Sequence, residues 1–213
     1  MRCQVNSSTN MIKIVEGLLS KYYLQELKNY FLEYDNWKFK SNITGSDDLS
    51  FGDIGFDQTL YDTKILKSSN SVPFISPICD SFNSILTKPL LLTAQEQVEE
   101  FIGRSVIPIR SRADMTVYNP EKYKHGIHID IPLKHITCIF YINNSDGNTI
   151  IYDYNKTIII KEIEPVENRL LIFDGNLPHT GHSPSKNKFR ILINMNFFDE
   201  DSCDEWKKNE LYH

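Results

Sequence analysis

The stretch NRLLIFDGNLPHTGHSPSKNKFRILINMNFF, residues 168–198, contains two apolar strands with a turn and two histidines between them. The first strand, 169–173, stops at the turn signal Asp174-Gly175. The second, 189–197, alternates except at Leu192: its even-numbered positions share one face and its apolar odd-numbered positions share the other. This pattern predicts a β-rich core in the C-terminal half of the chain.

Five further segments upstream have the composition of strands: 114–118, 127–131, 135–143, 149–154 and 157–163. They are rich in Ile, Thr, Tyr and Phe and are separated by turn signals such as Asp146-Gly147. Seven short strands at regular spacing indicate a sandwich or barrel rather than a parallel α/β sheet. We therefore expect a mainly β protein with a jelly-roll (double-stranded β-helix, cupin-like) core over residues 106–198.

Residues 1–105 predict a mostly helical layer that supports this core. A strand at 11–16 precedes a helix capped by Ser20, a second helix is expected to begin at Ser76-Pro77, and a third at the capping box 93–96. The segment 41–73 between the first two helices reads as a long loop. With 199–213 as a C-terminal tail, we expect the 213 residues to form a single domain.

Charge and cysteine content narrow the class of protein. The net charge of −5 and the absence of a Lys/Arg block disfavour nucleic acid as a partner. The four cysteines are scattered, which argues against a zinc knuckle or a disulfide scaffold. The N-terminus lacks the apolar region of a secretory signal and no apolar run is long enough for a membrane span, so we expect a cytoplasmic protein.

Two histidine-containing motifs suggest a metal site: HGIHID at 125–130 and PHTGH at 178–182. If 127–131 is a strand, His128 and Asp130 project to one side, which supplies two of the three ligands of a 2-His-1-carboxylate iron site. His179, just beyond an apolar strand and its turn, is the expected third ligand, with His182 as the alternative. A His-x-Asp pair alone is a weak signal, since a surface histidine beside an aspartate arises easily by chance.

The remaining histidines are expected to lie away from the metal. We expect His125 at the rim of the substrate mouth, and His135 and His213 on the surface. Arg190 is different: inside a barrel its planar guanidinium could bind the distal carboxylate of a dicarboxylate as a bidentate pair.

Together, His128, Asp130, His179 and Arg190 resemble the pattern of the prolyl 4-hydroxylase-like branch of the 2-oxoglutarate/Fe(II)-dependent dioxygenases. Two longer segments are similar to this family as well: HITCIFYINN at 135–144 and IEPVENRLLIFDGNLPH at 163–179. The segment 146–149 departs from the family, because Asp146 stands where the first glycine of a Gly-Gly pair is usual. The motif-level resemblance covers about residues 105–198.

The resemblance implies a role for each matching residue. His128, Asp130 and His179 correspond to the iron ligands and catalytic centre, and Arg190 to the residue that pairs with the 2-oxoglutarate C5 carboxylate. Tyr141 matches a tyrosine that binds the same carboxylate. Thr137 shares the face of Tyr141 on that strand, and Tyr118 either approaches the cosubstrate or is a buried barrel tyrosine.

The cofactors implied are Fe(II), 2-oxoglutarate as cosubstrate and O2, with ascorbate as a stimulating reductant. The reaction implied is hydroxylation of an unactivated C–H bond with release of succinate and CO2, on a prolyl residue of a peptide or protein. Two alternatives stay open: the same chemistry on a small metabolite, free amino acid or nucleobase, or a catalytically inactive jelly-roll binding module. Segments 41–73 and 119–126 are candidate lids over the substrate.

Overall fold

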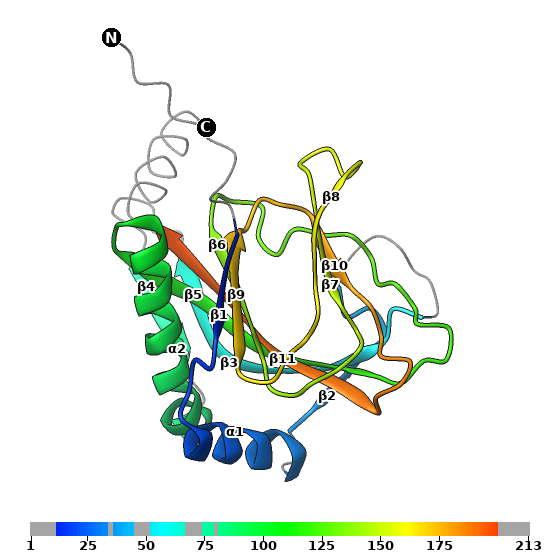
Figure 1. Ribbon diagram of the computed structural model, residues 1–213. Coiled ribbons are helices and arrows are strands. Elements are labelled where there is room, and N and C mark those ends of the chain that lie inside the picture. Colours follow the sequence, from blue (N-terminus) through cyan, green and yellow to red (C-terminus); the bar gives the residue numbers. More distant parts are fainter. Residues whose placement is uncertain (1–11, 34–35, 45–51, 67–73, 79–80, 200–213) are drawn as a thin grey trace.

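The computed structural model describes residues 12–33, 36–44, 52–66, 74–78 and 81–199 (Figure 1). Within these ranges, two antiparallel sheets lie face to face and two helices cover the outer side of the larger sheet (Figure 1). This arrangement confirms the expected mainly β jelly roll with N-terminal helices. No helix in the described ranges is long and apolar enough to cross a membrane.

The larger sheet has eight strands, and β11 lies near its middle between β6 and β5. Its strands, in spatial order with β4 attached to β3, are β1 (Ile12–Glu16), β9 (Arg169–Asp174), β6 (Ile136–Tyr141), β11 (Phe189–Asp199), β5 (Val106–Val117), β3 (Gly55–Leu66) with β4 (Phe74–Ile78), and β2 (Lys38–Lys40). The smaller sheet has three strands in the order β10 (His179–Gly181), β7 (Thr149–Tyr152) and β8 (Ile159–Ile163).

The alternation of side chains in these strands produces two separate cores. Cys138 and Phe140 of β6 point outward, toward the helices α1 (Lys21–Glu33) and α2 (Ser81–Ile102). Ile139 and Tyr141 of the same strand point inward, between the two sheets. The outward core also takes the apolar face of β11, so the even-numbered face of β11 is left to line the space between the sheets, as its sequence predicts.

The outward core makes a large contribution to stability, and Phe140, with no exposed surface, tests it. We expect Phe140→Ala to lower the free energy of unfolding by about 3–5 kcal/mol, because the cavity adds to the lost transfer energy. Denaturant unfolding would measure this change. Tyr22→Ala on the exposed side of α1, where Tyr22 is 77% exposed, is the control and should change stability by less than about 0.5 kcal/mol. Equal effects of the two substitutions would contradict the packing described here.

The first helix is confirmed, whereas the second and third are one helix. Ser20 caps α1, since its Oγ accepts a hydrogen bond from the Tyr23 amide at 3.3 Å. The segment at Ser76-Pro77 belongs to strand β4, and α2 runs through Pro89 without a break. Thr93, expected as a cap, instead donates its hydroxyl to the Pro89 carbonyl at 2.9 Å. Burial of Leu90, Leu91, Ala94 and Val98 on one face of α2 offsets the cost of about 3 kcal/mol for an interior proline.

Three strand predictions need correction. The expected loop 41–73 contains strand β3, which pairs with β5 and with β2, the strand just before the loop. Residues 127–131 form no strand: His128 makes one isolated bridge to His179. The short strand β10, which carries His179 itself, was not expected. In each case hydrogen bonding to a strand distant in sequence decides the conformation, which local pattern does not reveal.

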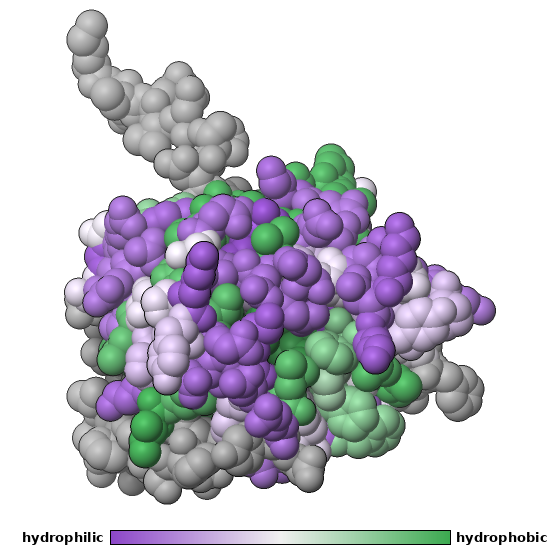
Figure 2. All heavy atoms as spheres, turned by 60° about the horizontal axis from the view of Figure 1, so that its bottom comes forward, coloured by the Kyte–Doolittle hydropathy of each residue, from purple (hydrophilic) through white to green (hydrophobic). Residues whose placement is uncertain are grey.

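The surface has a mixed character. Figure 2 shows a face on which hydrophilic residues predominate and hydrophobic residues form smaller groups. Among the described residues, large hydrophobic side chains are exposed on β8 and just before it, where Ile158, Ile159 and Ile160 are consecutive. Since β8 is an edge strand, this short segment is the most apolar edge of the smaller sheet.

Candidate metal centre

His128, Asp130 and His179 come together between the two sheets. The backbones of His128 and His179 exchange two hydrogen bonds of 3.0 Å, which sets their rings 4.7 Å apart. The Nε2 atoms of His128 and His179 lie 3.8 and 3.7 Å from the Asp130 carboxylate oxygens. Each residue can offer one ligand atom so that all three lie within 4.8 Å of one another. One metal ion could therefore contact all three side chains.

The imidazole tautomers suit a metal ligand. Nδ1 of His128 donates to the Gly126 carbonyl at 3.0 Å, and Nδ1 of His179 donates to the Leu177 carbonyl at 3.1 Å. These bonds place the proton on Nδ1 and leave the lone pair of Nε2 for a cation. His179 Nε2 is buried and has no hydrogen-bond partner within the described structure, which a bound cation would supply. The donor set thus fits a divalent transition metal.

The Asp130 carboxylate is held by four side chains. Its Oδ2 accepts hydrogen bonds from Thr137 Oγ1 at 3.2 Å, Asn194 Nδ2 at 3.0 Å and Asn196 Nδ2 at 3.1 Å. Its Oδ1 lies 3.3 Å from Arg110 NH2. The three bonds saturate Oδ2, so Oδ1 is the oxygen that remains open to a cation.

The electrostatics keep the carboxylate charged and the histidine neutral. Burial alone would raise the pKa of Asp130, but the nearby side chains of His179, His128 and Arg110 and the Asn194 amide lower this pKa well below its usual range. Burial lowers the pKa of His179 to about 4, against the opposing pull of Asp130. At neutral pH Asp130 is therefore charged and His179 neutral, as metal binding requires.

Asn196 supports the carboxylate from behind. It is fully buried, donates to Asp130 and Thr137, and accepts a hydrogen bond from Arg110 Nε at 3.1 Å. We expect Asn196→Ala to weaken Fe(II) binding about 10- to 100-fold, because a ligand that loses its supporting hydrogen bonds is less well oriented. Equilibrium titration of the metal-free protein would measure the change. Asn148→Ala, which removes only an exposed bond to Glu162, is the control. An unchanged affinity in Asn196→Ala would rule out this supporting role.

Arg190 lies at the other end of the same pocket. It is 5% exposed, and its NH2 donates to Thr149 Oγ1 at 2.7 Å. Thr149 Oγ1 also accepts the Tyr141 hydroxyl at 2.8 Å, and the guanidinium lies 5.9 Å from the centre of the Tyr141 ring. Gly181 leaves room for the guanidinium, because a Cβ there would come within 2.7 Å of Arg190 NH1. The strands β6, β7, β10 and β11 thus meet around one buried cation.

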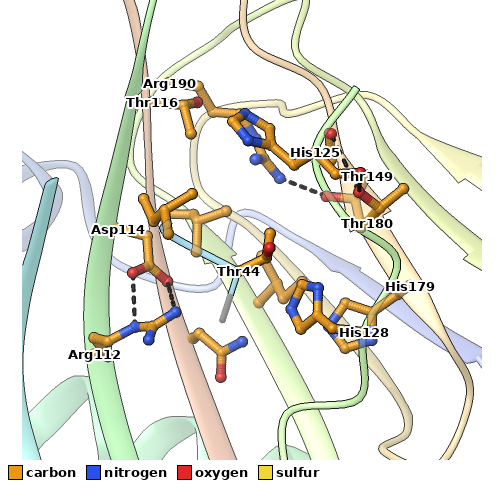
Figure 3. Close-up of a pocket in the computed structure, with 15 residues that line it drawn as sticks. Thr44, Arg112, Asp114, Thr116, His125, His128, Thr149, His179, Thr180 and Arg190 are labelled. Atoms are coloured by element: carbon orange, nitrogen blue, oxygen red, sulfur yellow. Dashed lines mark hydrogen bonds and ion pairs between the residues drawn. The ribbon is translucent and has the colours of Figure 1, made fainter. Parts of the chain in front are cut away.

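The pocket connects the metal group to Arg190 and has a strongly polar wall (Figure 3). Figure 3 shows His128 and His179 side by side, with Arg190, Thr149 and Thr180 at one end and the ion pair Arg112–Asp114 on another wall. Its lining residues are Ile43, Thr44, Arg112, Asp114, Thr116, His125, His128, Ile139, Thr149, His179, Thr180, Gly181, Arg190, Leu192 and Asn194. The polar side chains belong to both sheets, to the segment before β3 and to the segment between β5 and β6.

Three residues expected to bind cosubstrate are not among these lining residues. Tyr141 is fully buried behind Thr149. Thr137 contacts Asp130 and Asn196 at the metal end. Tyr118 is 53% exposed, at the end of β5, which excludes the buried barrel tyrosine given as its alternative. The structure therefore brings Arg190 and Tyr141 together through Thr149 and separates Thr137 and Tyr118 from them.

The positions expected for two other histidines, His125 and His135, were wrong. His125 is buried rather than at the rim: Nδ1 lies 2.7 Å from Asp53 Oδ1 and Nε2 lies 3.0 Å from Ser183 Oγ. His135 is also buried, with its ring against Gly175. His182 is not in the metal group, in agreement with the choice of His179. His213 lies outside the described residues.

Several site residues were not identified from sequence: Arg110, Arg112 and Asp114 on β5, Asn194 and Asn196 on β11, and Thr149 on β7. A signal for the first group existed, since Arg110, Arg112 and Asp114 alternate with Ser111 and Ala113. The expected strand, however, began at 114. Asp146 explains the departure from the Gly-Gly pattern: its carboxylate accepts the backbone amides of Ser185, Lys186 and Asn187 and holds the turn before β11.

No family model matches the chain, and no curated protein matches it significantly in sequence. Solved structures do match. A prolyl hydroxylase from Trichoplax adhaerens, in complex with a peptide fragment of the hypoxia inducible factor oxygen degradation domain, is 16% identical with a TM-score of 0.61, over 92% of this chain and 87% of that chain. A prolyl-4-hydroxylase from Pseudomonas putida is 13% identical with a TM-score of 0.55, and the match covers 91% of this chain and 95% of that chain. A non-haem α-ketoglutarate-dependent epimerase from nogalamycin biosynthesis is 10% identical with a TM-score of 0.62, and the match covers 89% of this chain and 78% of that chain.

Proposed function

From the fold that this chain shares with 2-oxoglutarate/Fe(II) oxygenases, we propose that it is a 2-oxoglutarate-dependent dioxygenase whose Fe(II) is held by His128, Asp130 and His179. The observation that carries the proposal is a pocket with two different sites: a His-Asp-His group whose two histidines line one end, and a buried arginine at the other. A structural jelly roll needs neither. Residues 1–213 would act as one domain, in a reducing compartment that suits the free thiol of Cys138.

The hydrogen bonds around Thr149 support a binding site for the distal carboxylate of 2-oxoglutarate. Thr149 Oγ1 already accepts two hydrogen bonds, from Arg190 and Tyr141, so its own proton is available to a ligand in the pocket that Thr149 lines. We assign the carboxylate contacts to Arg190 and Thr149. Tyr141 then orients Thr149 from behind, and Thr137 positions Asp130 instead of the cosubstrate.

Bound Fe(II) and 2-oxoglutarate supply the oxidising chemistry: O2 is consumed, one oxygen atom enters the substrate as hydroxyl, and the other leaves in succinate together with CO2. The protein's own residues orient the metal ligands and exclude water from the pocket. The Nδ1 bonds of His128 and His179 hold both rings in place, and Ile139 and Leu192 are the apolar lining residues between the sheets.

For the substrate we propose two classes. A prolyl residue in a peptide or protein is supported by the two prolyl hydroxylases of the same fold. A small molecule is supported by the charged wall formed by Arg112 and Asp114, and one structural neighbour acts in nogalamycin biosynthesis. The net charge of −5 continues to disfavour nucleic acid.

Anaerobic titration of the protein with Fe(II) and then 2-oxoglutarate tests the proposal. We expect a visible metal-to-ligand charge-transfer band that appears only when both are present and that is lost in His179→Ala. Iron that binds while the band stays absent would show that the pocket does not accept 2-oxoglutarate, and the protein would then be a metal-binding jelly-roll module.

A further inference from the structure

An ion pair forms a wall of the pocket that contains none of the residues assigned above to the metal or to the cosubstrate. Arg112 Nε lies 2.7 Å from Asp114 Oδ1, and Arg112 NH2 donates to Asp114 Oδ2 at 3.1 Å (Figure 3). Both residues project from β5 into the pocket, where the side chains of Arg112 and Asp114 remain 23% and 12% exposed. In the proposed enzyme this wall is therefore free for the primary substrate.

Arg112 has unused hydrogen-bonding capacity. A guanidinium has five N–H groups in a planar fork. Asp114 occupies the edge formed by Nε and NH2, so the edge formed by NH1 and NH2 can still take a second carboxylate. No other partner of this guanidinium is found in the described part of the chain.

The surroundings of the pair also contain unpaired polar atoms. Asn194 lies opposite Arg112 in the β11–β5 register, and its Oδ1 is buried with no partner among the described residues. Thr116 Oγ1, two positions beyond Asp114, is also buried without a hydrogen-bond partner among the described residues. Buried polar atoms without partners cost stability, so a polar ligand that pairs with them gains affinity. A substrate with an apolar ring alone would leave all of these groups unpaired.

The charges around the pocket indicate a substrate without net charge. Of the charged residues that line the pocket, Arg112 is paired with Asp114, and Arg190 has no carboxylate partner within the described structure. The Arg112–Asp114 pair has no net charge as a whole, and Arg190 is already assigned to a carboxylate of 2-oxoglutarate, so no unpaired charge is left for the primary substrate to balance. A substrate that carries one charge of each sign would preserve this balance.

We propose that the primary substrate is a free α-amino acid, with its carboxylate on the open edge of Arg112 and its ammonium group on Asp114. This inference rests on the proposed function and chooses between its two substrate classes. An α-amino acid places a carboxylate and an ammonium on one carbon, which matches a donor and an acceptor held side by side on one strand. A residue inside a peptide has neither charge.

Succinate release by the Fe(II)-loaded enzyme with 2-oxoglutarate and O2 tests the substrate class. The probes are the proteinogenic L-amino acids, the N-acetyl derivative and the carboxamide of each, and proline-containing peptides. We expect stimulation above the substrate-free rate with one or more free amino acids. Loss of either charge should lower kcat/KM by about 10- to 100-fold, the range for a hydrogen bond to a charged group.

Variants of the ion pair separate recognition from structure. In Asp114→Asn the ratio of kcat/KM for the free amino acid to that for its N-acetyl derivative should fall to a few-fold. In Arg112→Gln the ratio of kcat/KM for the free amino acid to that for its carboxamide should fall to a few-fold. A loss of stability alone would not change either ratio. Both variants should still form the charge-transfer band with Fe(II) and 2-oxoglutarate. Arg169→Gln, which breaks an ion pair with Glu16 outside the pocket, is the control and should leave both preferences unchanged.

Three results would overturn the inference: stimulation by peptides alone, equal rates with free and blocked amino acids, or no stimulation by any amino acid. If the charge-transfer band forms normally in these cases, the oxygenase proposal stands and only the substrate class is wrong. If the band never forms, the oxygenase proposal itself fails.

Discussion

Asp130→Ala should lower the affinity for Fe(II) by more than about 100-fold and abolish turnover. The carboxylate is the only anionic side chain in the His-Asp-His group, and loss of a residue that merely orients a ligand already costs about 10- to 100-fold. Metal-binding isotherms of the purified protein would measure the affinity. Asp153→Ala, which removes an aspartate from the turn between β7 and β8, is the control and should bind Fe(II) as the wild type does.

Loss of Asp130 also leaves Arg110 without its charge partner, so the variant should be less stable as well. The double variant Asp130→Ala, Arg110→Met separates these two effects. We expect it to recover much of the stability while metal binding stays lost, because the buried guanidinium is removed together with the carboxylate. Recovery of metal binding in the double variant, or wild-type affinity in the single one, would exclude Asp130 as a ligand.

Arg190→Met should raise the concentration of 2-oxoglutarate needed for half-saturation by more than about 100-fold while Fe(II) binding stays within about 2-fold. A charge-assisted bond contributes roughly 1.5–3 kcal/mol, and the guanidinium can form two bonds to one carboxylate. The arginine is 5% exposed, so water compensates poorly for its loss. The intensity of the charge-transfer band against 2-oxoglutarate concentration gives the affinity directly.

Two further variants define the origin of that effect. Arg190→Lys keeps the charge but not the fork and should lose less than Arg190→Met. Thr149→Val removes the hydroxyl that Arg190 and Tyr141 share and should weaken 2-oxoglutarate binding by about 10-fold. If all three variants bound 2-oxoglutarate normally, the cosubstrate would have to lie elsewhere in the pocket.

The sequence determined the parts of this protein that depend on local pattern. Period-2 alternation placed Arg190 and Asn194 on one face of β11 and Ile191 and Ile193 on the other, as the structure confirms. The grouping of His128, Asp130 and His179 followed from two short motifs and a family resemblance, and the structure brings these three side chains together. The faces of a strand follow from neighbours in sequence, whereas the metal group rested on the family resemblance, because residues 127–131 form no strand.

Tertiary structure alone decided the features that depend on distant partners. α2 runs through Pro89 because a buried face holds it against the sheet, and residues 55–66 form a strand because β5 offers them hydrogen bonds. His125 is buried because Asp53, far away in sequence, meets its ring.

The residues around the metal group could not be predicted from the sequence either. The three donors to Asp130 Oδ2 come from β6 and β11, and Arg110 comes from β5, so no spacing along the chain relates them. Alternation assigns a residue to a face, but only the pairing of strands decides which residues meet across that face.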